Sequence, residues 1–147
     1  MSSTTITRIF DAPIDVVFKA VSDYEAFPSF LDGANHVKVL QMDAAKGGRV
    51  EFSISVIKEF TYVLKMKHQP PGNLSWSFES GDLFKKNEGS WQLKDLGSGR
   101  TEAVYTLDVE FKMMVPKMIL NKLVSSNLPL MMDQYHEHAK KLKGKKA

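Results

Sequence analysis

The stretch from Arg100 to Leu142, RTEAVYTLDVEFKMMVPKMILNKLVSSNLPLMMDQYHEHAKKL, decides the fold, because the spacing of its apolar residues changes near the middle. Up to Met113, apolar and polar residues alternate, as in a strand with one buried face, which carries Ala103, Tyr105, Leu107, Val109 and Phe111. From Val115 onward, apolar residues recur at helical spacing and form one stripe of Leu120, Val124, Leu128, Met131, Tyr135, Ala139 and Leu142. We therefore predict a long strand followed by a long helix from Val115 to Leu142, whose stripe faces a sheet.

The same alternation recurs earlier in the chain, from Val37 onward. Turn sequences at residues 46–48, 69–73, 80–82 and 97–99 divide it, which predicts about six antiparallel strands joined as a meander. Before them, we predict a first strand over residues 3–10 and two short helices over residues 13–23 and 24–31. Pro129 removes a backbone donor inside the long helix, so we expect a kink near Ser125 and Ser126. This order of elements predicts the α+β class.

Length and composition predict one globular domain over residues 1–147. The chain has 43% hydrophobic and 25% charged residues and no cysteine, which excludes disulfides and thiolate metal sites. The first residues lack the features of a signal peptide, so we expect a cytoplasmic protein. The net charge is +3, and lysines gather in the tail. We expect residues 143–147 to be a frayed, solvated helix end, with contact to a ribosome or an anionic membrane as the alternative.

The ionisable residues do not suggest a catalytic or metal site. His136 and His138 are two residues apart on a predicted helix and point to different faces, while His36 and His68 lie near turns, where we expect them to be exposed. Asp108 and Glu110 share the strand face opposite Tyr105, so we expect them to meet solvent. The sequence therefore predicts no catalytic residue, no metal and no cofactor.

The candidate site is instead an apolar pocket between the sheet and the last helix. Tyrosine and tryptophan would give it polar groups. The alternative is that the same side chains form a filled core. Met113 and Met114 lie where the strand passes into the helix, at a possible pocket mouth. The predicted lining consists of Phe52, Ile54, Tyr62, Leu64, Trp76, Phe78, Trp91, Tyr105, Leu107, Val109, Met118, Ile119 and Leu123.

Several segments together resemble one protein family along nearly the whole chain. They are residues 11–18 (DAPIDVVF), 24–31 (YEAFPSFL, similar to the family's YPxFL segment), 88–93 (EGSWQL), 101–107 (TEAVYTL) and the pair Val115-Pro116. In order and spacing they are similar to the START-like superfamily, also called SRPBCC, of polyketide cyclase/dehydrase and lipid-transport proteins, which includes coenzyme-Q-binding START-domain proteins.

The resemblance implies a helix-grip fold, in which a curved antiparallel sheet of six to seven strands wraps around a long C-terminal helix. It also implies an internal cavity for a lipid, an isoprenoid quinone or a polyketide-like molecule. Because carriers, cyclases and ribosome-associated proteins share this fold, the resemblance does not determine one activity. We expect binding or transport of a hydrophobic small molecule. The alternatives are a cyclase or dehydratase that uses Tyr62, Tyr105 or a buried carboxylate, and a ribosome- or membrane-associated regulatory protein.

Overall fold

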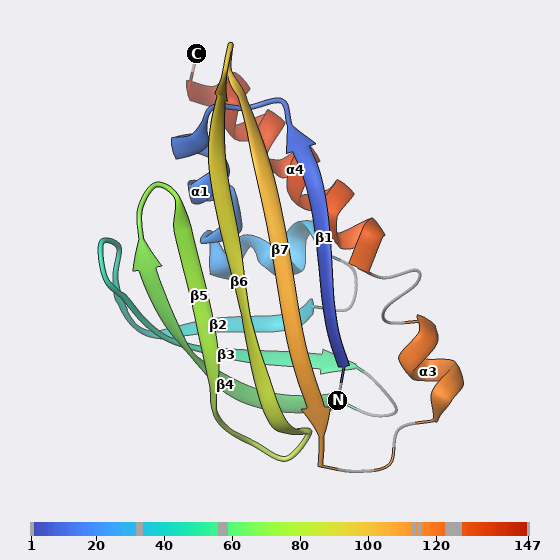
Figure 1. Cartoon of the computed structure of the whole chain (residues 1–147). Coiled ribbons are helices and arrows are strands. Elements are labelled where there is room, and N and C mark those ends of the chain that lie inside the picture. Colours follow the sequence, from blue (N-terminus) through green and yellow to red (C-terminus); the bar gives the residue numbers. More distant parts are fainter. Residues whose placement is uncertain are drawn as a thin grey trace.

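A seven-stranded antiparallel sheet and a set of helices on one of its faces make up the computed structural model of the chain (Figure 1). It describes residues 2–31, 34–55, 59–112, 114, 116–122 and 128–146. The strands are β1 (Ser2–Phe10), β2 (Ala34–Asp43), β3 (Gly47–Ser55), β4 (Glu59–Gln69), β5 (Asn73–Gly81), β6 (Phe84–Gly97) and β7 (Arg100–Phe111). The helices are α1 (Ile14–Val21), the 3-10 helix η1 (Tyr24–Ala26), α2 (Phe27–Phe30), α3 (Lys117–Lys122) and α4 (Leu128–Lys146).

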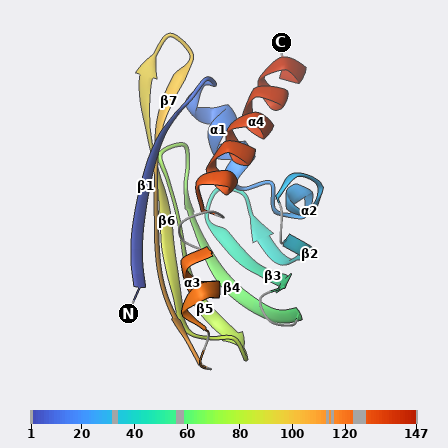
Figure 2. The ribbon, with the colours of Figure 1, turned by 90° about the vertical axis from the view of Figure 1, so that its right-hand side faces the viewer.

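The sheet is curved, and its helices lie on the concave side (Figure 2). The strand order is β1-β7-β6-β5-β4-β3-β2, so the meander from β2 to β7 is continuous and β1 pairs with its last strand. Helices α1 and α4 lie over one half of this face, while α3 lies beside the other half, next to the end of β7 (Figures 1 and 2). The predicted α+β class and helix-grip architecture are confirmed.

Strand register determines which side chains face the concave side. Trp91 of β6 is paired with Tyr105 of β7 and with Leu74 of β5, so all three point to the same face. Gly89 is placed opposite Trp76 in the same register, and a β-carbon at Gly89 would overlap the Trp76 indole ring. The absence of a side chain at this position therefore lets the indole lie flat across β6.

The predicted long helix is divided into α3 and α4 in the structure. The expected kink near Ser125 and Ser126 lies outside the described residues. Helix α4 begins at Leu128, which places Pro129 in its first turn, where the backbone N–H has no helical partner to lose. None of the helices that the structure describes combines the length and the hydropathy needed to cross a bilayer.

The buried face of α4 differs in part from the predicted stripe. Leu128, Tyr135 and Ala139 are buried as predicted, but Met132 is fully buried whereas Met131 is only half-buried. Met132 lies four residues after Leu128 and three before Tyr135, so it fits the same apolar stripe. The helix packs mainly on α1, with smaller contacts to β1 and α2, so its stripe faces another helix as well as the sheet.

Candidate functional site

The concave face of the sheet carries fully buried apolar side chains next to partly exposed ones. Trp91, Leu64, Tyr105 and Tyr62 are only 2%, 5%, 7% and 8% exposed, respectively. Other apolar side chains of the same face are half-buried although they point inward; they are Phe52, Ile54, Trp76, Phe78, Leu107, Val109 and Phe111. Solvent therefore reaches one part of a continuous apolar surface, which is the feature that a ligand could cover.

Aromatic rings form two connected groups along this surface. The first spans strands β3, β4, β6 and β7, with centroid distances of 5.5 Å from Phe52 to Tyr62, 5.0 Å from Tyr62 to Phe84 and 5.3 Å from Phe84 to Phe111. The second runs from β5 to α4, with 5.6 Å from Trp76 to Tyr105, 4.9 Å from Tyr105 to Trp91 and 5.1 Å from Trp91 to Tyr135. These separations are those of interacting rings, so each group forms a packed aromatic wall along the surface.

The polar groups of this interior are neutral. Burial raises the pKa of the Tyr62, Tyr105 and Tyr135 hydroxyls well above the usual tyrosine value, so all three stay protonated at neutral pH. Among the described residues these hydroxyls have no hydrogen-bond partner. In contrast, the Trp76 indole Nε1–H donates to Asn87 Oδ1 over 3.0 Å.

Asn87 is a buried polar residue, 5% exposed, that the sequence analysis did not identify. It is paired with Val109 and therefore faces the concave side. Asn87 lies between the turn at residues 80–82 and Gly89 in a polar run without alternation, so the sequence did not assign it to a strand face, although β6 begins at Phe84. The signal that could have identified it is the alternation of Leu93, Trp91, Gly89 and Asn87, continued backward past the glycine.

Most of the predicted lining residues lie together on this face. Of the thirteen predicted residues, those on the strands face inward, and Ile119 of α3 is half-buried. Met118 is different: it is 82% exposed, so it does not contribute to an enclosed lining, because α3 turns this side chain toward solvent. Leu123 lies outside the described residues.

His68 is buried, and the expectation that it is exposed near a turn was wrong. It is 5% exposed, because β4 continues through it to Gln69 and turns its side chain inward. Its Nδ1 lies 3.1 Å from the Ala44 carbonyl oxygen, so Nδ1 carries a proton and donates a hydrogen bond to that oxygen. Its Nε2 then accepts a hydrogen bond of 2.7 Å from the Tyr24 hydroxyl, whose pKa burial raises. His36 is exposed, as expected.

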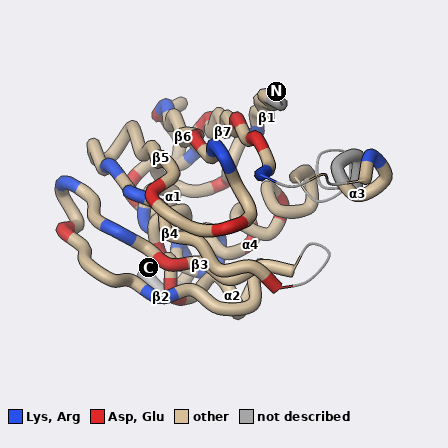
Figure 3. The backbone as a smooth tube through the Cα atoms, turned by 90° about the horizontal axis from the view of Figure 1, so that it is seen from below, with Lys and Arg blue, Asp and Glu red and all other residues tan. Residues whose placement is uncertain are grey.

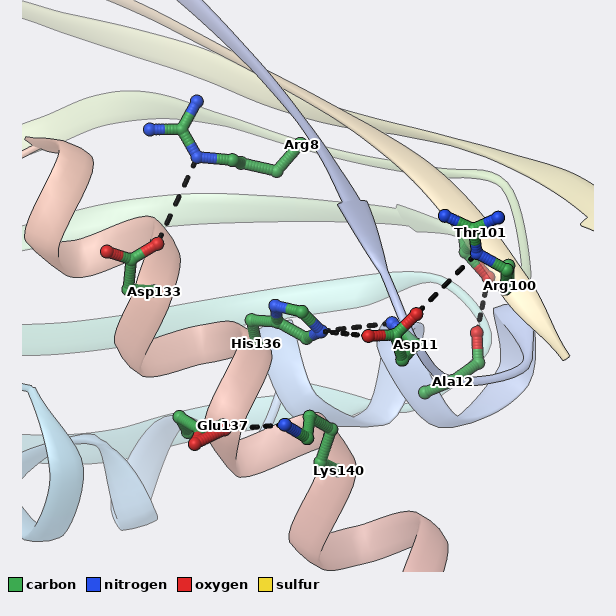
Figure 4. Close-up of polar contacts among 9 residues, drawn as sticks. All are labelled: Arg8, Asp11, Ala12, Arg100, Thr101, Asp133, His136, Glu137 and Lys140. Atoms are coloured by element: carbon green, nitrogen blue, oxygen red, sulfur yellow. Dashed lines mark hydrogen bonds and ion pairs between the residues drawn. The ribbon is translucent and has the colours of Figure 1, made fainter.

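His136 attaches α4 to the corner between β1 and α1 (Figure 4). Its Nε2 accepts a hydrogen bond of 3.0 Å from the Asp11 backbone N–H, and its ring stacks on Phe10 at a centroid distance of 5.0 Å. An Asp11 carboxylate oxygen also lies 3.6 Å from Nε of Arg100, at the start of β7. His136 is therefore part of the packing that holds α4 in place.

His138 attaches the same helix to a different place, which confirms that the two histidines point to different faces. Its Nε2 lies 3.2 Å from an Asp23 carboxylate oxygen, and its ring stacks on Phe30 at 4.0 Å. In the described ranges, no three His, Asp or Glu side chains converge as metal ligands.

The carboxylates lie away from the concave face. Asp108 alternates with Tyr105 and Leu107 and points to the convex side, where one of its oxygens lies 2.7 Å from Lys86 Nζ. It is half-buried rather than freely solvated, because Lys86 covers it. No Asp or Glu is buried among the residues that the structure describes. Among the described residues, the interior therefore offers tyrosine hydroxyls and the His68 imidazole, and no buried carboxylate, for acid or base chemistry.

Comparison with known proteins gives a family match and a shared fold. The family described as polyketide cyclase/dehydrase and lipid transport matches residues 10–134. A START superfamily protein from Mycobacterium smegmatis has a TM-score of 0.81 at 19% identity, with 95% of this chain and 98% of that chain covered. The Zhui aromatase/cyclase from Streptomyces sp. R1128 has a TM-score of 0.82 at 17% identity, covering 95% and 94%. Among curated protein sequences, none matches this chain.

Proposed function

Because this chain belongs to the polyketide cyclase/dehydrase and lipid-transport family, we propose that it binds a hydrophobic small molecule on the concave face of the sheet. The observation that supports this most is the row of inward-facing apolar side chains that remain half-buried beside a fully buried core. A ligand that removes about 200 Å² of such surface from water gains roughly 5 kcal/mol, at about 25 cal/mol per Å². That gain offsets part of the entropy cost of association.

The polar groups on this face favour a neutral ligand that carries carbonyl or hydroxyl oxygens. The protonated Tyr62, Tyr105 and Tyr135 hydroxyls can each donate one hydrogen bond and also accept one. Among the described residues no Lys or Arg is buried, so a carboxylate ligand would have no buried cation to pair with. The aromatic walls add flat surfaces on which a ring system can stack.

Binding of the neutral fluorescent probe N-phenyl-1-naphthylamine tests this proposal. Trp76 and Trp91 lie on the proposed face, so a bound probe should quench their emission by energy transfer. Leu107→Gln places an amide on the half-buried part of β7 and should weaken probe binding at least tenfold. Val104→Gln is the matched control, because Val104 is half-buried on the opposite face of the same strand. Equal affinities of the two variants at similar melting temperatures, or no probe binding by the unmodified protein, would contradict the proposal.

A cyclase or dehydratase activity is the second candidate, and the interior tyrosines are the observation that favours it. A protonated hydroxyl can donate a proton or a hydrogen bond to the carbonyl of a polyketide-like substrate. Because burial raises their pKa, Tyr62 and Tyr105 stay protonated at neutral pH, so they can donate a hydrogen bond to a substrate carbonyl and are not suited to act as bases. With a poly-β-carbonyl substrate, Tyr105→Phe should then lose turnover while the probe still binds. Unchanged turnover in both Tyr62→Phe and Tyr105→Phe would remove this candidate.

A further inference from the structure

Two methionines next to β7 are far more exposed than any other large apolar side chain of the described residues. Met114 is 92% exposed and Met118, on α3, is 82% exposed. The other exposed large apolar residues reach only 38% to 43% and are scattered over the molecule; they are Ile9, Leu40, Leu96 and Leu130. Because burying a methionine side chain is favourable by roughly 1.5–3 kcal/mol, two neighbouring ones left in water suggest a surface that becomes covered.

The charge around these methionines has one sign. From Lys112 to Lys122 the sequence contains three lysines and no acidic residue, and Lys112 and Lys117 are exposed. In the part of the chain that the structure describes, neither of these two ammonium groups has a carboxylate partner. Figure 3 shows α3 at one edge of the molecule, apart from the strands and without an acidic residue on it. The surface thus combines exposed apolar side chains with exposed cations.

We propose that this surface, formed by Lys112, Met114, Pro116, Lys117 and Met118 and here called the α3 surface, docks on a membrane that contains anionic lipids. The flexible methionine side chains enter the boundary between headgroups and acyl chains, and the lysines contact lipid phosphates. A short helix with two methionines is too small for a specific protein interface, which buries about 800 Å² per partner. A lipid surface needs no matching shape, only apolar and cationic groups in this arrangement.

The position of the α3 surface connects it with the proposed ligand. It follows β7 directly, at the end of the sheet where Leu107 and Val109 are half-buried (Figure 2). A hydrophobic molecule could therefore pass between the membrane and the concave face without crossing bulk water. The docking itself goes beyond the proposed function, because it needs only the α3 surface and not a bound ligand.

Cosedimentation of the full chain with vesicles tests the docking. Phosphatidylcholine vesicles are compared with vesicles that also contain phosphatidylserine, at low and at high salt. We expect binding to the anionic vesicles only, weakened by salt. Lys112→Gln/Lys117→Gln should lower the partition coefficient roughly thirtyfold, since each lysine near an anionic surface contributes appreciably. Met114→Ser/Met118→Ser should lower it roughly tenfold or more.

Two controls separate this surface from others on the molecule. Leu40→Ser/Leu96→Ser removes two exposed apolar residues elsewhere, and Lys140→Gln/Lys141→Gln removes two cations from α4; both should bind like the unmodified protein. All four double variants change exposed side chains, so their melting temperatures should agree. The inference is overturned if the unmodified protein binds neither kind of vesicle, if it binds both kinds equally, or if only the α4 variant loses binding.

Probe binding by the same variants separates the two proposals. Met114→Ser/Met118→Ser should keep the probe affinity of the unmodified protein while it loses vesicle binding. Probe binding without any vesicle binding would overturn the docking alone. Vesicle binding without probe binding would overturn the proposed function alone.

Discussion

Replacing Tyr24 with phenylalanine would remove the hydroxyl that donates to His68 while the ring stays in place. The hydroxyl lies 2.7 Å from His68 Nε2, and the two residues are 4% and 5% exposed. His68 Nδ1 already donates to the Ala44 carbonyl, so Nε2 must act as the acceptor. In the variant, this buried acceptor has no donor, because water has little access to it.

The size of the effect follows from this geometry. A buried group left without its hydrogen bond costs about 1–3 kcal/mol. For a chain of this length, 1 kcal/mol corresponds to roughly 3–4 °C in melting temperature, so we expect a decrease of about 3–12 °C. Tyr105→Phe is the matched control, since it also removes a buried tyrosine hydroxyl, but one without a partner among the described residues. Its free energy of unfolding should change by less than about 0.5 kcal/mol.

Urea unfolding monitored by circular dichroism would measure both variants at neutral pH. A loss of stability of the same size in both variants would show that the hydrogen bond to His68 gives the Tyr24 hydroxyl no larger effect than the Tyr105 hydroxyl has. That result would refute the reasoning. A Tyr24→Phe variant as stable as the unmodified protein would refute it as well. A double variant that also carries His68→Leu should lose less than the sum of the single losses, because neither partner is then left unpaired.

Three further predictions concern stability. In the folded protein, burial raises the pKa of four tyrosines above the usual tyrosine value of 10.0. Their contribution to the free energy of unfolding should therefore be constant below about pH 10. Above that pH it should decrease by up to about 1.4 kcal/mol per pH unit for each tyrosine, because the unfolded chain loses these protons first. A flat profile to pH 11.5 in urea melts would contradict this. Gly89→Ala should lower the free energy of unfolding by about 1–3 kcal/mol, because the added methyl group overlaps Trp76. Gly144→Ala, in open space on α4, should raise it by up to about 1 kcal/mol. Calorimetry that finds a change of the same sign in both variants would count against this packing. His136→Ala should cost about 1–2 kcal/mol and His36→Ala nearly nothing, and equal melting temperatures of the two variants would disprove the role of His136 in holding α4.

Alternation along the strands made most of the sheet predictable. Positions such as Tyr62, Leu64 and Tyr105 face inward in the structure because a strand turns every second side chain to the same face. The first part of β6 does not show this alternation. Lys85, Lys86, Asn87 and Glu88 form an unbroken polar run, so the sequence there shows no period, although Asn87 faces the interior.

The helical part was harder to predict, because apolar spacing does not show where a helix stops. The stripe from Leu120 to Leu142 fits one helix as well as two, and the spacing around Leu128 and Tyr135 allows either Met131 or Met132 to be the buried methionine. Similarly, nothing in the sequence around His68 shows that η1 brings Tyr24 to it. That contact joins residues 44 positions apart, and only tertiary packing determines it.

The pairing of β1 with β7 has a consequence for how the chain folds. Ile6 lies opposite Tyr105, and every strand partner of β1 is found about a hundred residues later in the chain. At synthesis rates of about 5–20 residues per second, the first strand waits roughly 5–20 s before its neighbour exists. Such late closure places this protein among the slower folders, in which an early, unpaired segment must be kept from associating with other nascent chains.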